Sequence, residues 1–282
     1  MELAWKKKDE RNVLETKYKN HVAYLSFPAL EETGLVKHGF STRLGGVSEG
    51  VWSSMNLSFT RGDNPDHVQE NYSRIAAALD VKKENMVLTY QTHTTNIRLV
   101  TEADAGKGVI RERDYKDVDG LITNIPGLVL VTFFADCVPL YFLDPVKKAI
   151  GLSHSGWRGT VHGIGKKTAE EMNLAFGTRP EDLIACIGPS ICQDCFEVGE
   201  EVAEEFQAAF HPKWHKQLLR PNGKPGKYQL DLWRANEIIL QEAGIKQIYT
   251  TNICTYCNPD LLYSHRRTGD KRGNLCAFLS LK

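Results

Sequence analysis

The chain has 282 residues, and its 35 Lys and Arg balance its 35 Asp and Glu, so the formal net charge is zero. A neutral chain offers no global field for nucleic-acid phosphates or anionic membrane, so we expect neither as a partner. No apolar run approaches the roughly 20 residues that cross a bilayer, and the charged start lacks the apolar stretch of a signal peptide. We therefore predict a cytoplasmic protein, folded as a single domain over residues 1–282, with residues 1–30 a less certain N-terminal extension.

Two hydrophobic periodicities alternate along the chain. Apolar stripes at three and four residue steps predict helices over Asp66–Leu79, Val161–Phe176, Gly199–Phe210 and Asp231–Ala243. Runs rich in β-branched and aromatic residues predict strands over Val87–Tyr90, Ile97–Val100, Leu128–Phe134, Leu140–Leu143, Ala149–Ser153, Leu183–Ile187 and Cys276–Leu281. Asp231 is a candidate N-cap and Gly244 a candidate helix stop. We expect an α/β (α+β) fold, with a mixed β-sheet core and flanking helices.

Seven cysteines without a secretion signal favour reduced thiols over a disulfide framework. Two pairs, Cys192 with Cys195 and Cys254 with Cys257, have the CxxC spacing of zinc ligands. The pairs are separated by 59 positions, however, whereas zinc ribbons place theirs about 15 to 20 residues apart. The spacing therefore favours ordinary thiols, with a structural zinc site as the alternative.

A thiol and an imidazole flank a predicted hairpin. The turn signal at Asp144–Lys147 joins two apolar runs, and if Asp144 faces Lys147, Cys137 lies directly opposite His154. Opposed side chains on one face are about 4.5 to 5.5 Å apart at Cβ, which suits a shared metal ion or a Cys–His catalytic pair. A register slip of one residue would remove both interpretations.

A third metal-ligand candidate, His93, occupies a polar break between two strand-like segments. One Cys and two His ligands would leave an open fourth position on zinc, as catalytic zinc sites do. A lone loop histidine is more often an ordinary surface residue, so the residues alone leave this site open.

The chain resembles the YfiH-type family, which is also called the laccase-domain or polyphenol oxidase family. The resemblance rests on motifs in family order at His38–Arg43, Gly45–Gly50, Ser54–Leu57, Gln91–His93, Asp119–Thr123, Ala135–Pro139, His154–Thr160, Ile187–Ser190, Phe196–Gly199, Leu230–Asn236 and Ser264–Arg267. It implies a YfiH-like fold similar to that of toxin deamidases. It also implies a purine nucleoside phosphorylase with adenosine deaminase activity on adenosine, inosine and methylthioadenosine. The implied cofactor is Zn²⁺, or alternatively Cu²⁺, at the positions of His93, Cys137 and His154.

Further candidates stand beside these motifs. Arg43 and Arg158 lie in glycine-flanked loops, where a guanidinium can hold phosphate, although structural ion pairs would explain both. Asp136 is the nearest carboxylate that could shuttle a proton, but alternation along a strand points it away from the side of Cys137 unless the turn is irregular. Asn56 and Gln91 are candidates for binding ribose or base, and turn or cap roles explain them nearly as well. For Asp136, a buried carboxylate that is hydrogen-bonded to the backbone is an equally good alternative to a role in proton transfer.

Three rival functions remain at this stage. The nine histidines contain no His-x-His pair, which argues against a multicopper cluster but not against a single copper ion and phenol oxidation. A metal-free hydrolase would use Cys137 as a nucleophile activated by His154. A metal-dependent binding or storage protein is the non-enzyme alternative.

Overall fold

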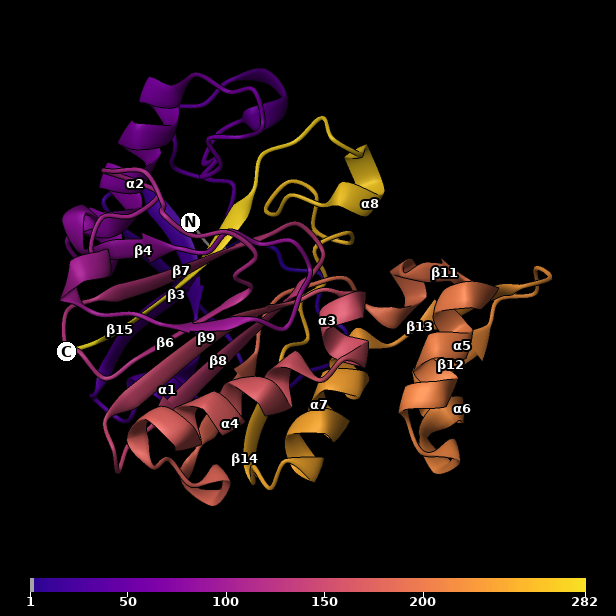
Figure 1. Ribbon diagram of the computed structural model, residues 1–282. Coiled ribbons are helices and arrows are strands. Elements are labelled where there is room, and N and C mark those ends of the chain that lie inside the picture. Colours follow the sequence, from indigo (N-terminus) through magenta and orange to yellow (C-terminus); the bar gives the residue numbers. More distant parts are fainter. Residues whose placement is uncertain (1–2) are drawn as a thin grey trace.

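The computed structural model describes residues 3–282 and contains two six-stranded sheets that lie face to face (Figure 1). The first sheet has the order β1-β2-β3-β15-β7-β4. Its strands are β1 (Glu15–Lys19), β2 (Val22–Ser26), β3 (Val36–Ser41), β15 (Leu275–Leu281), β7 (Val129–Phe134) and β4 (Met86–Leu88). The β4 and β7 pair is parallel and the other pairs are antiparallel, so this sheet is mixed.

The second sheet has the order β14-β10-β8-β9-β6-β5. Its strands are β14 (Gln247–Thr250), β10 (Ile184–Ile187), β8 (Val138–Asp144), β9 (Ala149–Ser155), β6 (Gly120–Thr123) and β5 (Ile97–Leu99). Its two outer pairs, β10 with β14 and β5 with β6, are parallel. The mixed core that the sequence predicts is confirmed, but it is divided between two sheets.

Successive side chains along the strands point alternately to the two faces of each sheet, and both faces are packed. Along β7, Leu130 and Phe134 point into the core between the sheets, whereas Val129 and Val131 point to the opposite face. This alternation follows from the two-residue period of a strand. Tyr141 and Leu152 fill the same central core from the second sheet. The sheets are therefore held together by apolar burial over their facing surfaces.

Helices cover both outer faces, so the molecule has four layers (Figure 1). Helix α2 (Pro65–Leu79) packs on the first sheet, while α4 (Ile164–Phe176) and α7 (Leu232–Glu242) pack on the second. Three short helices outside the lobe described below are α1 (Pro28–Glu31), α3 (Trp157–Val161) and α8 (His265–Thr268). The predicted helix over Val161–Phe176 is interrupted at Gly163, whose φ of +72° is left-handed and ends the preceding turn.

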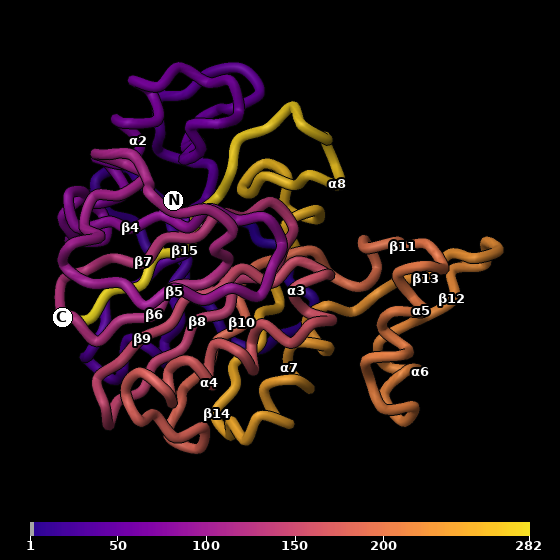
Figure 2. Tube along the Cα trace, viewed as in Figure 1, coloured from indigo at the N-terminus to yellow at the C-terminus, as the bar shows by residue number. Residues whose placement is uncertain are grey.

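A lobe projects from the second sheet (Figure 2). It comprises α5 (Glu200–Ala209), α6 (His215–Leu218) and a small sheet of β11 (Glu197–Gly199), β13 (Lys227–Leu230) and β12 (Leu219–Pro221). Its apolar residues Val202, Phe206 and Leu230 belong to the same buried cluster as Leu140 and Phe142 of β8. The lobe and the body therefore share one core.

The first thirty residues, to which the sequence assigns no role, contribute β1, β2 and α1. Leu14, Leu25 and Phe27 are buried in the core between the sheets. Among residues 3–282, no helix is long and apolar enough to cross a membrane.

Candidate active site

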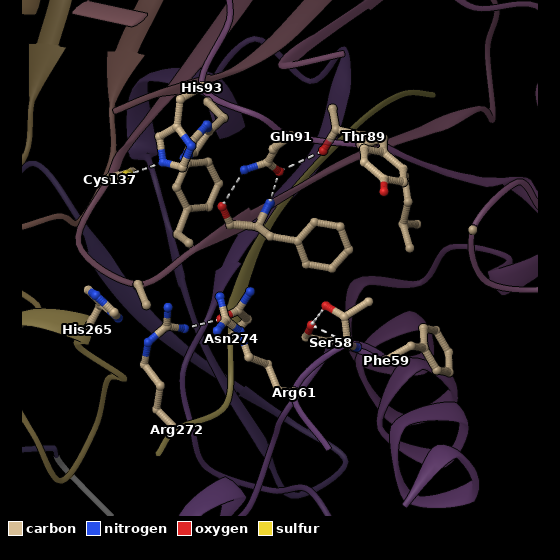
Figure 3. A pocket seen from close by; sticks show the side chains of 18 of the residues that line it. Ser58, Phe59, Arg61, Thr89, Gln91, His93, Cys137, His265, Arg272 and Asn274 are labelled. Atoms are coloured by element: carbon tan, nitrogen blue, oxygen red, sulfur yellow. Dashed lines mark hydrogen bonds between the residues drawn. The ribbon is translucent and has the colours of Figure 1, made fainter. Parts of the chain in front are cut away.

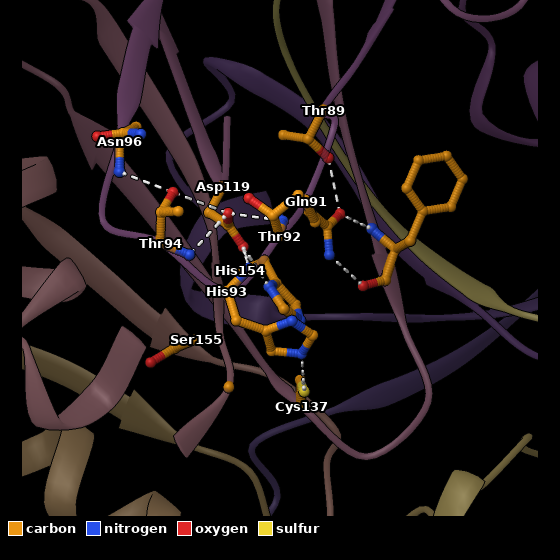
Figure 4. Close-up of polar contacts among 12 residues, drawn as sticks. Thr89, Gln91, Thr92, His93, Thr94, Asn96, Asp119, Cys137, His154 and Ser155 are labelled. Carbon is orange, nitrogen blue, oxygen red and sulfur yellow. Dashed lines mark hydrogen bonds and ion pairs between the residues drawn. The ribbon is translucent and has the colours of Figure 1, made fainter. Parts of the chain in front are cut away.

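His93, Cys137 and His154 converge where the chain passes between the two large sheets (Figure 4). His93 lies between β4 and β5, and Cys137 lies between β7 and β8, so each belongs to a connection from the first sheet to the second. His154 is near the end of β9. The potential ligand atoms of the three side chains all lie within 4.8 Å of one another, and Cys137 Sγ is 3.9 Å from His93 Nε2.

The hairpin that carries two of these side chains has a different register from the predicted one. Asp144 pairs with Ala149, so His154 lies opposite Pro139 and not opposite Cys137. The turn is longer because Asp144 accepts hydrogen bonds from the Val146 and Lys147 N–H groups, and Lys148 adopts a left-handed φ of +51°. Moving the partner of Asp144 by two positions preserves the face of every side chain. Cys137 and His154 consequently still meet, as diagonal neighbours.

Asp119, just before β6, orients the His154 imidazole and holds the backbone of the His93 loop. Its carboxylate lies 2.8 Å from His154 Nδ1 and accepts hydrogen bonds from the backbone N–H groups of Thr92, His93 and Thr94. The contact at Nδ1 leaves Nε2 of His154 free to face the other ligands, as in carboxylate–histidine–metal arrangements. The sequence motif Asp119–Thr123 pointed to this residue, but its contact with His154 was not foreseen.

Cys137 and His154 alter each other's protonation. Burial raises the pKa of the Cys137 thiol, but the His154 and His93 imidazoles outweigh it and bring the pKa down to about 6. Burial likewise lowers the pKa of His154, yet Cys137 and Asp119 raise it to about 9. At neutral pH the site therefore favours a Cys137 thiolate beside a protonated His154. A thiolate is also the form of cysteine that binds metal.

The surroundings of the three side chains fit a metal ion. A Cβ on Gly156 would lie 2.7 Å from His93 Cδ2 and 3.2 Å from Cys137 Sγ, so only glycine leaves room for both side chains. A zinc ion at about 2.3 Å from sulfur and about 2.1 Å from nitrogen needs ligand atoms within 4 Å or so of each other, close to the observed spacing. One thiolate and two imidazoles suit zinc and copper alike.

His93, Cys137 and His154 border a cavity of about 550 Å³ (Figure 3). Its opposite side carries Arg61, Arg272 and His265. The sequence suggested phosphate contacts for His265–Arg267, with a solvated turn as the favoured alternative, but it singled out neither Arg61 nor Arg272. Arg272 is only 6% exposed, its Nε has no hydrogen-bond partner, and its other contacts are with Gly273 and Asn274. Burial and the neighbouring Arg61 lower the pKa of Arg272 to about 10. This wall is suited to binding an anion.

Other predicted site residues lie elsewhere or are occupied. Arg43 donates to the carbonyl oxygens of Ser53 and Pro259, and Arg158 stacks on Trp157; neither lines this cavity. Asn56 is fully buried and bonds to Ser58 and Asp63.

Two predicted residues remain close to the ligands. Gln91 lines the cavity, but its amide group is bound to Thr89 and to both backbone groups of Phe133. Asp136 has a left-handed φ of +93°, so the irregular turn that its catalytic role requires is present. Its two carboxylate oxygens nevertheless accept hydrogen bonds from Thr255 Oγ1 and the Arg266 N–H group.

The chain is similar to a known protein family over most of its length. Residues 37–282 match the family described as "Multi-copper polyphenol oxidoreductase laccase". The chain belongs to this laccase-domain family. Its relative in Bacillus subtilis (strain 168), named purine nucleoside phosphorylase YlmD, is 36% identical over 250 residues, which cover 86% of this chain and 88% of the relative.

Other laccase-domain proteins give the same picture. A relative from an unknown prokaryotic organism, named adenosine deaminase RL5, is 35% identical over 83% of this chain and 90% of its own length. The crystal structure of Bacillus licheniformis YfiH superimposes with a TM-score of 0.89 at 33% identity, covering 96% of this chain and all of the other. YlmD from Geobacillus stearothermophilus gives a TM-score of 0.88. The YfiH-like fold that the sequence motifs imply is thereby confirmed.

Proposed function

We propose that this protein is a purine nucleoside phosphorylase that cleaves adenosine, inosine and methylthioadenosine with phosphate, and that also deaminates adenosine. The names of its laccase-domain relatives support both activities. The observation in this chain that carries the proposal is the buried Arg272 guanidinium, unpaired at Nε, across one cavity from the His93–Cys137–His154 ligands. We further propose that residues 1–282 form a single catalytic domain.

Phosphate binds at the arginine wall. Arg272 and Arg61 each have a buried Nε atom without a partner, and His265 lies beside them. Guanidinium groups hold phosphate oxygens through paired N–H donors, and an anion would relieve the repulsion between the two arginines. This assignment replaces Arg43 and Arg158, which do not line the cavity; Arg61 lines it and also pairs with Asp270 at 3.0 Å.

The purine occupies the aromatic part of the cavity. Phe59, Tyr90, Phe133 and Phe134 line it, and flat apolar surfaces favour burial of a purine ring. Gln91 fixes the backbone of Phe133 through two hydrogen bonds, so its role is to hold this wall in place. We assign Asn56 a structural role, because its amide is occupied by Ser58 and Asp63 of its own loop and by the Asn274 N–H group.

Zinc is the proposed metal, held by His93, Cys137 and His154, with copper as the alternative. When bound, it supplies Lewis acidity to the polar atoms next to it. The chain's own residues then hold the reactants. In phosphorolysis, a phosphate oxygen bonds to C1′ of the ribose while the C1′–N9 bond breaks, and the arginine wall keeps that oxygen near C1′. In deamination, water adds at C6 and ammonia leaves.

Asp136 has a positioning role in the candidate active site. Its oxygens are engaged by Thr255 and by the first turn of α8, which carries His265 into the cavity. We therefore assign it to holding the Cys137 loop against α8, and not to proton transfer.

Two alternative activities, phenol oxidation and metal-free hydrolysis, are tested in the same experiment. The family description favours a copper-dependent phenol oxidase, although only two histidines lie in this cluster. The pairing of Cys137 with His154 favours a metal-free hydrolase that attacks through sulfur. We also place the protein in the cytoplasm, because free thiols persist in reducing compartments.

The deciding experiment incubates zinc-loaded protein with adenosine, with and without phosphate, and measures adenine, ribose 1-phosphate and inosine. Adenine and ribose 1-phosphate should form only with phosphate, and inosine in both reactions. His93→Ala should abolish turnover, whereas the exposed His162→Ala should not. Activity that survives His93→Ala and chelation would favour the metal-free pair. Oxygen consumption with a phenol by copper-loaded protein would favour the oxidase, and no turnover at all would refute an enzyme.

A further inference from the structure

The two CxxC pairs lie together in space despite their distance in sequence. Cys192 and Cys195 follow β10, and Cys254 and Cys257 follow β14. These two strands are parallel neighbours, so the loops after them leave the same edge of the sheet. Backbone contacts continue beyond the strands, since Thr255 donates its N–H to the Ser190 carbonyl oxygen at 3.1 Å. The topology therefore brings both pairs to one place.

The four sulfur atoms have the spacing of a single metal site. All lie within 4.8 Å of one another, and Cys195 Sγ is 3.5 Å from Cys257 Sγ. In a tetrahedral zinc site with Zn–S bonds of about 2.3 Å, sulfurs are about 3.8 Å apart. Cys192 and Cys254 are buried, while Cys195 and Cys257 are partly exposed. A small inward movement of the sulfur atoms would complete the coordination shell.

The surroundings are suited to thiolates. The Cys192 N–H group donates to Cys254 Sγ at 3.3 Å, a contact that stabilises negative sulfur. Lys8 forms a 3.0 Å ion pair with Asp194, which lies within the first CxxC pair, so its ammonium group is held close to the cluster. Four thiolates around Zn²⁺ carry a net negative charge, which a nearby ammonium group partly offsets.

We propose that these residues form a structural zinc site, separate from the candidate active site, with the ligands Cys192, Cys195, Cys254 and Cys257. Four protein ligands leave no position for a reactant, which is the arrangement of structural zinc. Zinc would be bound here whether or not the protein acts on nucleosides. No covalent or redox step is involved, because zinc displaces only thiol protons.

This zinc would fix the loops that support the active site. The Ile191 N–H group donates to the Asp136 carbonyl oxygen, and Thr255 Oγ1 donates to the Asp136 carboxylate. Each of these residues is next to a cysteine of the cluster, and Asp136 is next to Cys137. Zinc held by the four cysteines would therefore fix both loops against the turn that presents Cys137.

Metal analysis of the untagged protein tests the proposal. We expect about two zinc ions per wild-type chain when both sites are filled, and one fewer in the Cys195→Ala, Cys257→Ala double variant. His93→Ala should lose only the other ion, which separates this result from any failure of the proposed activity. Cys276→Ala, a buried cysteine outside the cluster, should keep the wild-type content. An unchanged zinc content in the double variant would overturn the proposal.

Alkylation of the intact wild-type protein provides a test that does not depend on a folded variant. Cys195 and Cys257 should resist a thiol reagent when zinc is bound and react after chelation, as mapped by mass spectrometry. Equal reaction before and after chelation would contradict a zinc site. A Cys195–Cys257 disulfide in protein purified under reducing conditions, or iron in place of zinc, would also overturn the assignment.

Discussion

At the scale of single residues, Gly156 has the most direct control over the candidate active site. A methyl group at this position would lie within 2.7 Å of the His93 ring, so His93 would have to move away from Cys137. Gly159, three positions further, is a matched control because a Cβ there would meet no atom closer than 3.5 Å.

We predict that Gly156→Ala weakens zinc binding at His93, Cys137 and His154 by at least tenfold, while Gly159→Ala leaves it within about twofold. Competition with a chromophoric chelator measures both affinities, in protein whose four cysteine ligands have been replaced or separately saturated. Equal affinities for the two variants would mean that Gly156 does not shape the metal centre.

His38 is a second residue with a measurable consequence. Burial lowers its pKa to about 4, and its Nε2 accepts a hydrogen bond from the Phe27 N–H group. The unfolded chain, with a histidine pKa near 6.5, binds a proton between pH 6.5 and 4 that the folded chain excludes. The free energy of unfolding should therefore fall as the pH falls through this window, by about 3 kcal/mol in total.

Urea unfolding at several pH values tests this prediction. The His38→Gln variant should be less stable at neutral pH but should lose the part of the pH slope that His38 causes. His162→Gln, at an exposed position, should keep the wild-type slope. If His38→Gln and wild type had the same slope, another group would be responsible.

At the scale of elements, α7 begins and ends at the residues that the sequence predicts. Asp231 is the N-cap, and its side chain accepts a hydrogen bond from the Arg234 N–H group at 2.9 Å. Gly244 follows the helix with a left-handed φ of +93°. Both residues act through local backbone chemistry, which is why a single sequence is enough to locate them.

We predict that Asp231→Ala lowers the free energy of unfolding by about 1 kcal/mol, because an N–H group of α7 loses its acceptor. Asp231→Asn keeps an oxygen at the same position and should stay near the wild-type value. Denaturant unfolding of the three proteins measures the difference. A full loss in the Asn variant would show that the carboxylate charge, and not the cap, matters.

Contacts between distant elements were harder to predict. The hairpin of β8 and β9 was correctly placed, but its register depended on the left-handed Lys148, which no residue pattern indicates. Arg61 and Arg272 meet only because β15 returns to the first sheet at the end of the chain. The distance between the CxxC pairs argued against a shared site, yet the parallel pairing of β10 and β14 brings them together.

At the scale of the whole molecule, the N-terminal segment joins regions at opposite ends of the chain. The Lys6 N–H group donates to Asn258 Oδ1, and the Lys8 N–H group donates to the Asn252 carbonyl oxygen. The Asn252 side chain in turn donates to the carbonyl oxygens of Asp9 and Arg11. These contacts cover the loop that contains Cys254 and Cys257.

We predict that deleting residues 1–11 lowers the melting temperature by several degrees, since a loss of 1 kcal/mol shifts a protein of this size by roughly 2 to 4 °C. Lys8→Ala alone should have a smaller effect, because its backbone hydrogen bond remains. Differential scanning calorimetry compares the three proteins. A deletion without effect would mean that the segment lies on the loop but does not stabilise it.

The recognisable family motifs explain why the three candidate metal ligands could be picked out from the sequence, whereas Arg61 and Arg272 could not. Ligand positions came from a resemblance that names particular residues, and the fold then placed them within reach of one another. The wall is formed by side chains whose local sequence resembles ordinary surface loops, and the burial of Arg272 becomes visible only in the folded chain.

The passage of the chain from one large sheet to the other, at the loops of His93 and Cys137, has a consequence for biosynthesis. A folding intermediate with only one sheet formed would hold these two ligands in unfixed loops, and His154 would lie on a strand not yet docked. Tight metal uptake should therefore be a late event, after the sheets have assembled. An incompletely folded chain would then not bind a wrong metal ion tightly at these positions.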